Sequence, residues 1–537
     1  MKKTIGFIAL CTAAVMTFSG CGTKNSTDIS AESGAKLDFS KLSPEKNEMP
    51  ISESEITLNV VTNRTATYAG KNYPYHEVGA FEALREKTGV FVNFEAVTDE
   101  KINLMFASDE LPDMLLLNWN KLGGALKCAS DGQIISLDEQ LQKYAPNFTK
   151  LLAENKTIYA QLTEADGYVY QFPFIRGEQQ LRVFQGFQIR QDWLSKLGLS
   201  VPKTRDEFYE VLKAFKERDP NGNGKADEIP YIAEKSYGID RMFNFWGMDE
   251  FYIDNGKVKA GWLQPEFKEY VQWVKKLYDE GLLDPDYAIT DRKQFDSKVS
   301  NEQGGAWYGL AGSTLGRLTT LMKPKVPDFK IAGMPWLAAP DGKSYAVNSE
   351  YVSCVTDLAY AISSQCKNVK AAVKWLDYGY SEEGSRTLNF GIEGKSYTME
   401  NGVPTYTQLI TNNPDGLPMS EALAKYTVAS GYPTMQSVDY FNQFMQTEQK
   451  DAIDVWEQAD STHSLPTLKH TIEESDIVSR KYTEIKSYHD SMINKIIIGK
   501  EPIEKFDEYI EKIKSMGIED IVAAKQAAYD RYLKTIG

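Results

Sequence analysis

The chain has 537 residues, of which 42% are hydrophobic and 25% are charged, and its formal net charge at pH 7 is −15. This length suits about three or four domain-sized units, or two large lobes, of a soluble globular protein. The acidic balance excludes nucleic acid as a partner, because binding to phosphates needs a basic surface.

Residues 1–20 have the pattern of a lipoprotein signal peptide. The basic start "MKK" precedes the apolar run "TIGFIALCTAAVMTF", which is too short for a helix that stays in a membrane. The run ends in "FSGC", so we expect cleavage before Cys21 and a lipid on its thiol, which would hold the protein on the extracellular face of the cytoplasmic membrane. The alternative is ordinary secretion, with Cys21 incidental. Residues 21–54 are predicted to be a flexible tether.

The first folded region alternates strands and helices. Strands are expected at 56–63, 90–97 and 114–117, with one helix between them that ends at Gly89 and another over 100–108. This alternation predicts a parallel sheet covered by helices. Ligands bind beyond the carboxyl ends of parallel strands, so four residues that follow these strands are candidates for ligand binding: Asn63, Arg64, Asn118 and Trp119.

A second region begins near Phe184 with two helices, and Thr204 and Glu207 form a capping box at the start of the second. The loop "RDPNGNGKADEIP" follows, in which side-chain oxygens alternate around a glycine as in a calcium loop. The loop departs from an EF-hand because its twelfth position is a proline and the closing acid comes earlier. We expect a structural calcium ion held by Asp219, Asn221, Asn223, the Lys225 carbonyl, Asp227 and Glu228. The alternative is an Asx-rich turn that caps the preceding helix.

Further helices are expected toward the C-terminus. "QPEFKEYVQWVKKLYDEGLL" is an amphipathic helix stopped at Gly281, and three more helical patterns occur in "KNVKAAVKWLDYGYSEEG", "PIEKFDEYIEKIKSMG" and "IEDIVAAKQAAYDRYLK". The four histidines form no metalloprotease pair, and Cys128, Cys354 and Cys366 have neither the spacing of a metal site nor that of a disulfide framework.

Several of these segments carry a resemblance to a known family. The chain resembles the extracellular solute-binding proteins, family 1, of carbohydrate ABC importers, and within them the large lipoprotein branch of Gram-positive bacteria. The supporting segments include "TGVFVNFEAV…EKINLMFASDELPDML", "GQIISLDEQLQKYAPNFTKLL", "DGYVYQFPF", "WLDYGYSEEGSRTLNFGIEGKSYTMENG" and the region from "IRQDWLSKLGL" through "DPNGNGKADEIP". Their order is specific, although no single segment is decisive.

The resemblance implies an α/β, two-lobe, periplasmic-binding-protein-like fold (type II) with a hinge and an interlobe cleft. Lobe one would comprise 55–178 and 333–390, and lobe two 179–332 and 391–537, with the calcium loop in lobe two. The expected function is a monomeric, lipid-anchored substrate-binding component that captures an oligosaccharide by lobe closure and delivers it to the permease subunits of an ABC transporter. Two alternatives stay open: a secreted glycoside hydrolase, which needs two carboxylates at the scissile bond, and a binder of a non-sugar solute such as a peptide.

A sugar site needs flat aromatic rings and polar side chains that bind hydroxyls. Four tryptophans lie in loop-like, mostly glycine-flanked segments, and we expect two from lobe one, Trp119 and Trp336, and two from lobe two, Trp246 and Trp307, to stack on the sugar. Core packing is the alternative for each. Arg190 and Asp192 would bind hydroxyls, or else form an interlobe salt bridge. Glu393 lies in a glycine-flanked loop and is a further candidate, with a structural turn as its alternative.

Overall fold

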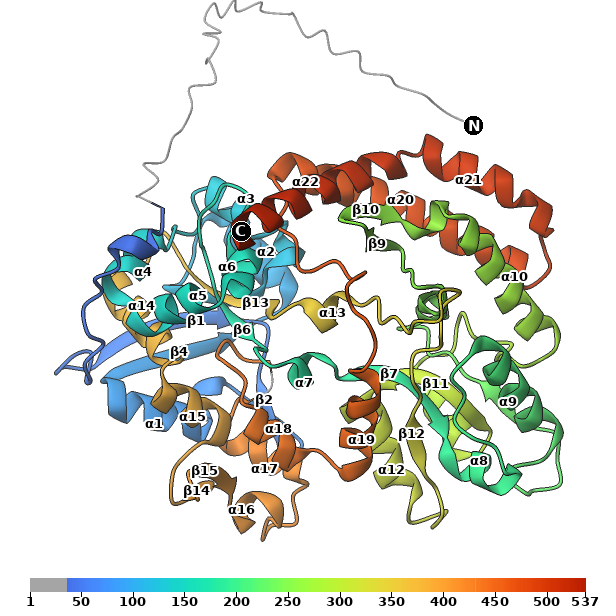
Figure 1. Ribbon diagram of the computed structural model, residues 1–537. Coiled ribbons are helices and arrows are strands. Elements are labelled where there is room, and N and C mark those ends of the chain that lie inside the picture. Colours follow the sequence, from blue (N-terminus) through green and yellow to red (C-terminus); the bar gives the residue numbers. More distant parts are fainter. Residues whose placement is uncertain (1–35, 430) are drawn as a thin grey trace, which may run out of the picture. The chain divides into compact units, whose positions relative to one another are not determined.

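The computed structural model describes residues 36–429 and 431–537 (Figure 1). The predicted signal peptide and Cys21 lie outside the described residues. Within the part that is described, no helix is both long and apolar enough to cross a membrane.

Lobe one is built on a five-stranded sheet with the order β4-β1-β5-β13-β6 (Figure 1). Its strands are β1 (Ile56–Thr62), β4 (Val90–Ala96), β5 (Met114–Asn118), β6 (Phe172–Ile175) and β13 (Val355–Ile362). The strands β1, β4 and β5 are parallel, whereas β13 runs antiparallel to both β5 and β6. The three predicted parallel strands are therefore confirmed.

Both faces of this sheet are buried, because successive residues of a strand point to opposite sides. Val60 and Leu116 pack into one hydrophobic cluster, while Val61 and Leu117 pack into another. Around the sheet lie α1 (Gly79–Thr88), α2 (Asp99–Ser108), α3 (Ala125–Ser130), α4 (Asp138–Tyr144), α5 (Pro146–Glu154), α6 (Lys156–Leu162), α14 (Val369–Tyr378) and α15 (Glu382–Phe390).

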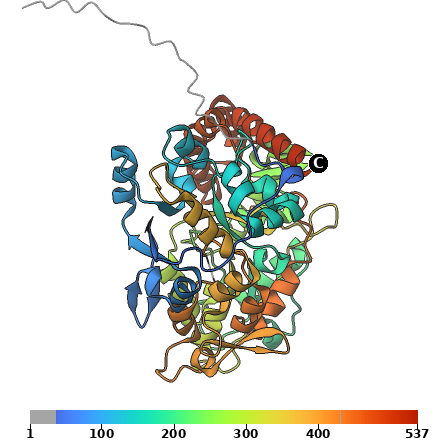
Figure 2. The same ribbon diagram turned by 90° about the vertical axis from the view of Figure 1, so that its left-hand side faces the viewer.

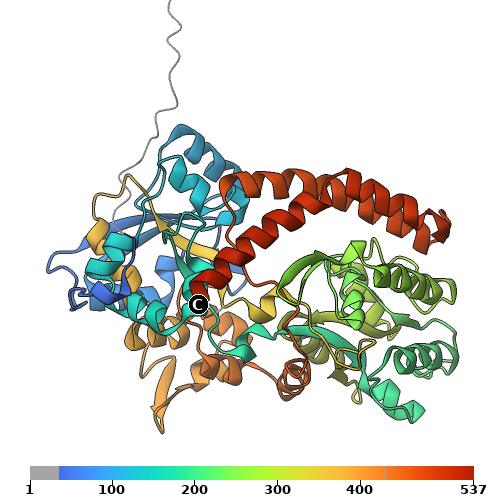
Figure 3. The same cartoon turned by 45° about the horizontal axis from the view of Figure 1, so that its top comes forward.

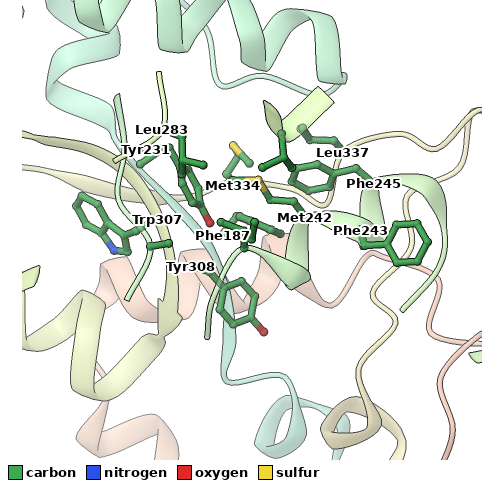
Figure 4. Packing of buried hydrophobic residues seen from close by; sticks show 14 of the residues in the cluster. Phe187, Tyr231, Met242, Phe243, Phe245, Leu283, Trp307, Tyr308, Met334 and Leu337 are labelled. Atoms are coloured by element: carbon green, nitrogen blue, oxygen red, sulfur yellow. The ribbon is translucent and has the colours of Figure 1, made fainter. Parts of the chain in front are cut away.

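Lobe two has a four-stranded sheet with the order β12-β7-β11-β8. Its strands are β7 (Gln185–Arg190), β8 (Ile229–Tyr231), β11 (Gly304–Leu310) and β12 (Ile331–Gly333). A hairpin, β9 (Phe251–Asp254) with β10 (Lys257–Ala260), stands apart from this sheet. The helices of this lobe include α8 (Gln191–Leu197), α9 (Arg205–Glu217), α10 (Pro265–Asp279), α11 (Arg292–Ser300), α12 (Arg317–Met322) and α19 (Thr447–Trp456). Figure 4 shows its core, in which Phe187, Trp307 and Tyr308 pack among aliphatic and aromatic side chains.

Three C-terminal helices complete the fold: α20 (Ile472–Ile497), α21 (Phe506–Ser515) and α22 (Ile518–Ile536). Figure 3 shows α20 and α22 running side by side. Ile485 and Ile493 of α20 enter the core of lobe two, while α22 contacts both β10 of lobe two and α6 of lobe one. The C-terminal helix therefore touches both lobes.

The predicted tether at 21–54 is too long. Leu37 is buried in the core of lobe one, and its backbone N–H donates to Asp138 Oδ1 at 2.9 Å. The side chain of Asn47 donates to Asp377 Oδ2 at 2.9 Å. Apolar residues of the segment, Leu37 among them, bury surface against the lobe, so residues 36–54 belong to lobe one and not to a tether.

Two predicted lobe boundaries also differ from the structure. Trp336 and Tyr351 pack into the core of lobe two, so this lobe continues to about 354 and not 332. After α15 the chain stays with lobe one through β14 (Tyr397–Glu400), β15 (Val403–Tyr406), α16 (Gln408–Thr411), α17 (Met419–Tyr426) and α18 (Val438–Phe444), as Figure 2 shows below the first helices of the chain. Phe390 extends into a hydrophobic cluster with this segment, and α17 contacts α1 and the small hairpin strand β2 (Ala66–Tyr68), which pairs with β3 (Lys71–Tyr73). The chain returns to lobe two at α19, not at 391.

Candidate functional site

Three cavities meet at Asp357, near the start of β13. The central cavity measures about 470 Å³ and is lined by Asn120 and Asp357 of lobe one and by Arg241 and Glu250 of lobe two. Two side cavities of about 340 and 350 Å³ share Asp357 with it. We call these three cavities together the groove. Because residues of both lobes line its central part, a molecule bound there contacts both lobes at once.

Charged side chains form the lobe-two wall of the central cavity. Arg241 Nη1 lies 3.0 Å from Asp249 Oδ2, and the Tyr482 hydroxyl donates to Glu250 Oε2 at 2.9 Å. Burial raises the pKa of Glu250 to about 7. Lys525 of α22 lines the same wall, with its ammonium 4.8 Å from the ring centroid of Phe251. This wall therefore offers both donors and acceptors of hydrogen bonds.

Several polar atoms in the groove have no hydrogen-bond partner among the residues described. They are Gln171 Nε2 in one side cavity, Thr356 Oγ1 in the other, and His470 Nδ1 next to the central cavity. Burial lowers the pKa of His470 to about 4, so its ring is neutral at pH 7. Since buried polar groups in proteins are nearly always hydrogen-bonded, these atoms mark places where a polar ligand would bind.

Three of the predicted ligand-binding residues lie at the groove, and one of them is Asn118, which lines the same side cavity as Arg64. Trp119 lines one side cavity, although its ring is buried and its Nε1–H donates to the Ala359 carbonyl at 2.9 Å. Arg64 lines the other side cavity and donates from Nη1 to the Gly431 carbonyl at 3.1 Å. Asn63 lies outside the groove in a smaller cavity, where its side chain donates to Asp99 Oδ1 at 2.6 Å.

The expectation of exposed ring faces on Trp246, Trp307 and Trp336 is wrong, because all three rings lie in the core of lobe two. Trp307 Nε1–H donates to Gln188 Oε1 at 2.8 Å, and the Arg205 guanidinium lies 4.2 Å from the ring centroid of Trp246. Their neighbouring glycines serve close packing instead of open loops. A Cβ on Gly305 would lie 2.5 Å from Phe215, and one on Gly333 would lie 2.6 Å from the backbone of Ala452.

Arg190, Asp192 and Glu393 also lie away from the groove. Arg190 and Asp192 form a buried pair inside lobe two, with hydrogen bonds of 2.9 and 2.7 Å, so the pair is not an interlobe salt bridge. The Arg190 guanidinium is packed between the rings of Trp193 and Phe329. Glu393 accepts a hydrogen bond of 3.3 Å from the Tyr397 hydroxyl, beside β14.

The residues missed from the sequence include most of the charged lining of the central cavity: Asp240, Arg241, Asp249, Glu250, Asp357, Lys469 and Lys525. One signal was available for Asp357. It is the single acid in the apolar strand "VTDLAYAI". Acidic residues are rare in buried strands, so an acid at this position indicates a functional role.

The predicted calcium loop folds into a compact, side-chain-bonded turn. Asp219 Oδ1 accepts from the N–H of Gly222 at 2.9 Å, and Asp219 Oδ2 accepts from that of Gly224 at 2.9 Å. Asn223 donates from Nδ2 to Asp227 Oδ1 at 3.0 Å. In this arrangement no group of three or more acidic, histidine or cysteine side chains within residues 36–429 and 431–537 is close enough to hold a metal ion.

Glu228, however, lacks a partner for its carboxylate. Both of its oxygens are buried without a hydrogen bond to any described residue. Burial raises the pKa of Glu228, and the nearby charges of Asp219 and Asp227 raise it further. A cation beside these three acids would remove both costs, so the chemistry of the loop suits calcium.

Comparison with known proteins adds the family. The family model described as "Bacterial extracellular solute-binding protein" matches residues 68–386. The chain belongs to this family of solute-binding proteins. The predicted family membership and two-lobe fold are confirmed.

Individual relatives of this solute-binding protein cover nearly all of the chain. The fructooligosaccharide ABC transporter substrate-binding protein FusA of Streptococcus pneumoniae is 26% identical over 97% of both chains. Lipoprotein LipO of Bacillus subtilis is 27% identical, over 83% of this chain and 87% of LipO. Among solved structures, the alginate-binding protein AlgQ2 superposes with a TM-score of 0.71 and 24% identity, over 90% of this chain and 100% of AlgQ2.

Proposed function

We propose that this protein is the substrate-binding component of a carbohydrate ABC importer and that it captures an oligosaccharide in the groove. The observation that carries the proposal is the meeting of three cavities at Asp357 in a groove that both lobes line and that contains polar atoms without hydrogen-bond partners among the described residues. Sugar hydroxyls both donate and accept, so an oligosaccharide can satisfy groups of both kinds. The fructooligosaccharide specificity named for FusA, a relative over the whole chain, supports the same class of ligand.

Capture requires that the ligand bind the closed form better than the open form. A ligand shifts a conformational equilibrium only by its differential affinity for the two forms. Asn120 and Asp357 belong to lobe one, whereas Arg241 and Glu250 belong to lobe two. A sugar chain that touches both pairs gains its full set of hydrogen bonds only when the lobes are closed, and this difference would drive closure.

The proposed reaction is binding without chemistry. The rival hydrolase would use two carboxylates in the central cavity as acid and base or nucleophile. Asp249 is a poor candidate for either role, because its carboxylate is paired with Arg241 at 3.0 Å. Incubation of the protein with each bound sugar, followed by chromatography of the products, separates the two functions, since a hydrolase releases shorter sugars and a binding protein returns the sugar intact.

A thermal-shift screen with a glycan library, followed by calorimetry on the hits, tests the proposed function. We expect at least one oligosaccharide to raise the melting temperature and to bind with a 1:1 stoichiometry. If no glycan binds and a peptide or another solute does, the carbohydrate assignment is wrong.

We also propose that the 219–228 loop binds a structural calcium ion through its three acids, two asparagines and the Lys225 carbonyl. Glu228→Gln provides a test, because the neutral amide removes the repulsion from Asp219 and Asp227. Without calcium, this variant should melt at a higher temperature than the parent protein. Calcium should raise the melting temperature of the parent protein by more than that of the variant, and an equal response of the two would contradict the assignment.

Anchoring through a lipid on Cys21 is a further part of the proposal, supported by the "FSGC" sequence and by the name of the relative LipO. The first described contact with lobe one is made by Lys36, whose Nζ donates to the Asp166 carbonyl at 2.6 Å. Equal release of the parent protein and of Cys21→Ala into the culture medium would refute the anchor.

A further inference from the structure

Several of the positive charges that line the groove are already paired with acids of the chain. Arg241 pairs with Asp249 at 3.0 Å, Lys469 with Glu164 at 2.8 Å, and Arg176 with Glu350 at 3.4 Å. A cation that is committed to an internal carboxylate is a weak site for a carboxylate of a ligand, because binding there would break or crowd the existing pair.

Two further cations line the groove without an ion pair to any described carboxylate. Arg64 donates to the carbonyl of Gly431 at 3.1 Å. Lys525 has its ammonium over the ring of Phe251, and the charge of Glu250 in the same wall acts on it. The positive charge of Lys525 therefore lies near a negative charge in the same wall, whereas the Asp357 carboxylate has no ion-pair partner among the described residues.

The side chain of Asp357 has neither an ion pair nor a hydrogen bond with any other residue that the structure describes. Asp357 lines all three cavities, so a ligand bound in any one of them occupies a cavity that this residue borders. Gln171 lines one of the same cavities, and its Nε2 has no partner although the residue is only 5% exposed. The groove therefore presents an unpaired anionic acceptor where its cavities meet and an unused neutral donor in one side cavity.

We propose that the groove selects neutral oligosaccharides over uronic-acid oligosaccharides, and that Asp357 is the residue that makes this selection. The inference rests on the proposed function. Hydroxyls of a neutral sugar donate to the Asp357 carboxylate and accept from the Gln171 amide. A uronate carries one carboxylate per sugar unit and meets the unpaired Asp357 in a groove where Arg64 is the one lining arginine without a nearby acid among the described residues. Two like charges at close range in a partly buried groove weaken binding by tenfold or more.

Calorimetry with size-matched sugars tests the selection. The probes are neutral trisaccharides to pentasaccharides, such as kestose and maltotriose to maltopentaose, and oligogalacturonates and oligoalginates of the same lengths, all at low salt. We expect at least one neutral series to bind and every uronate to bind at least about tenfold more weakly. Uronate binding equal to or tighter than neutral binding would overturn the inference while leaving the proposed function intact. If neither class binds and no glycan of the library screen binds either, the proposed function itself fails, and the inference with it.

Substitution assigns the selection to Asp357. In Asp357→Asn we expect the neutral ligand to bind about five- to tenfold more weakly, because a hydrogen bond to a charged acceptor becomes a neutral one. The ratio of neutral to uronate affinity should fall as well, because the repulsion is gone. The control is Asp328→Asn, the same change at an exposed acid of lobe two that lines no part of the groove.

Both variants should melt as the parent protein does, since Asp357 has no hydrogen bond or ion pair within the described chain to lose. An unchanged affinity ratio in Asp357→Asn would show that another residue makes the selection. Should that variant fold poorly, Asp357→Ser gives a second neutral variant, and the sugar panel on the parent protein still decides whether the selection exists.

Discussion

Replacement of Trp307 by alanine should destabilise the protein without a specific effect on sugar binding. The ring is fully buried in lobe two, where it packs against Phe295 at 5.7 Å between centroids and donates to Gln188 Oε1. The cavity left by a core tryptophan costs about 3–5 kcal/mol. The Gln188 side chain, itself fully buried, loses a hydrogen bond, which adds about 1–3 kcal/mol.

The expected loss is therefore about 4–8 kcal/mol in the free energy of unfolding. Trp307→Phe keeps most of the ring and loses the hydrogen bond, so it should cost less than Trp307→Ala. In the double variant Trp307→Phe with Gln188→Leu both partners are apolar, and the two changes should cost less together than the sum of the single costs.

Urea denaturation followed by tryptophan fluorescence measures these losses, and calorimetry with a bound oligosaccharide measures affinity below the unfolding transition. A Trp307→Ala protein with parental stability and abolished sugar binding would refute the reasoning. That result would mean that the ring faces the ligand, as the sequence-based expectation had it, and not the core.

Three further predictions follow from buried charges and from the N-terminal segment. Arg190→Met leaves the carboxylate of Asp192 buried without its partner, so it should lower the free energy of unfolding by about 3–5 kcal/mol. Urea denaturation measures this loss, and a loss below about 1 kcal/mol would show that the pair is solvated. Burial raises the pKa of the Asp377 carboxyl to about 6, above its value in the unfolded chain, so the folded state holds this proton more tightly and loses stability as the pH rises from 4 to 6. In Asp377→Asn this pH-dependent loss in the free energy of unfolding should be smaller by about 2–3 kcal/mol. Parallel plots of stability against pH for the two proteins would contradict the prediction. Deletion of residues 22–35 should leave the melting temperature unchanged. Deletion of residues 22–51 should lower it, because the surface that Leu37 covers becomes exposed and Asp138 and Asp377 each lose a hydrogen-bond partner. Equal melting temperatures of the two deletion variants would show that residues 36–51 are not part of the fold.

Local features of the fold were predictable from the sequence because neighbouring residues determine them. The capping box of Thr204 and Glu207 begins α9 as predicted, since both hydrogen bonds lie within one turn. Gly89 takes a left-handed conformation with φ of 69° at the end of α1, which glycine adopts without steric cost. The strand that ends at Thr62 and the apolar run from Met114 likewise form neighbouring strands of one sheet, as predicted. A short, continuous apolar run is typical of a strand whose two faces are both covered by helices.

The tertiary structure alone decided which side chains reach the groove. A tryptophan between glycines is equally consistent with an open loop and with a tightly packed strand, and only the neighbours of Gly305 across the fold distinguish the two. Asp357 and Glu250 lie more than a hundred residues apart in the sequence and share a cavity because β13 and the segment after Trp246 face each other across the lobes. Sequence pattern reports periodicity along one element, whereas a binding groove depends on contacts between distant elements, and those are set by how the two cores pack.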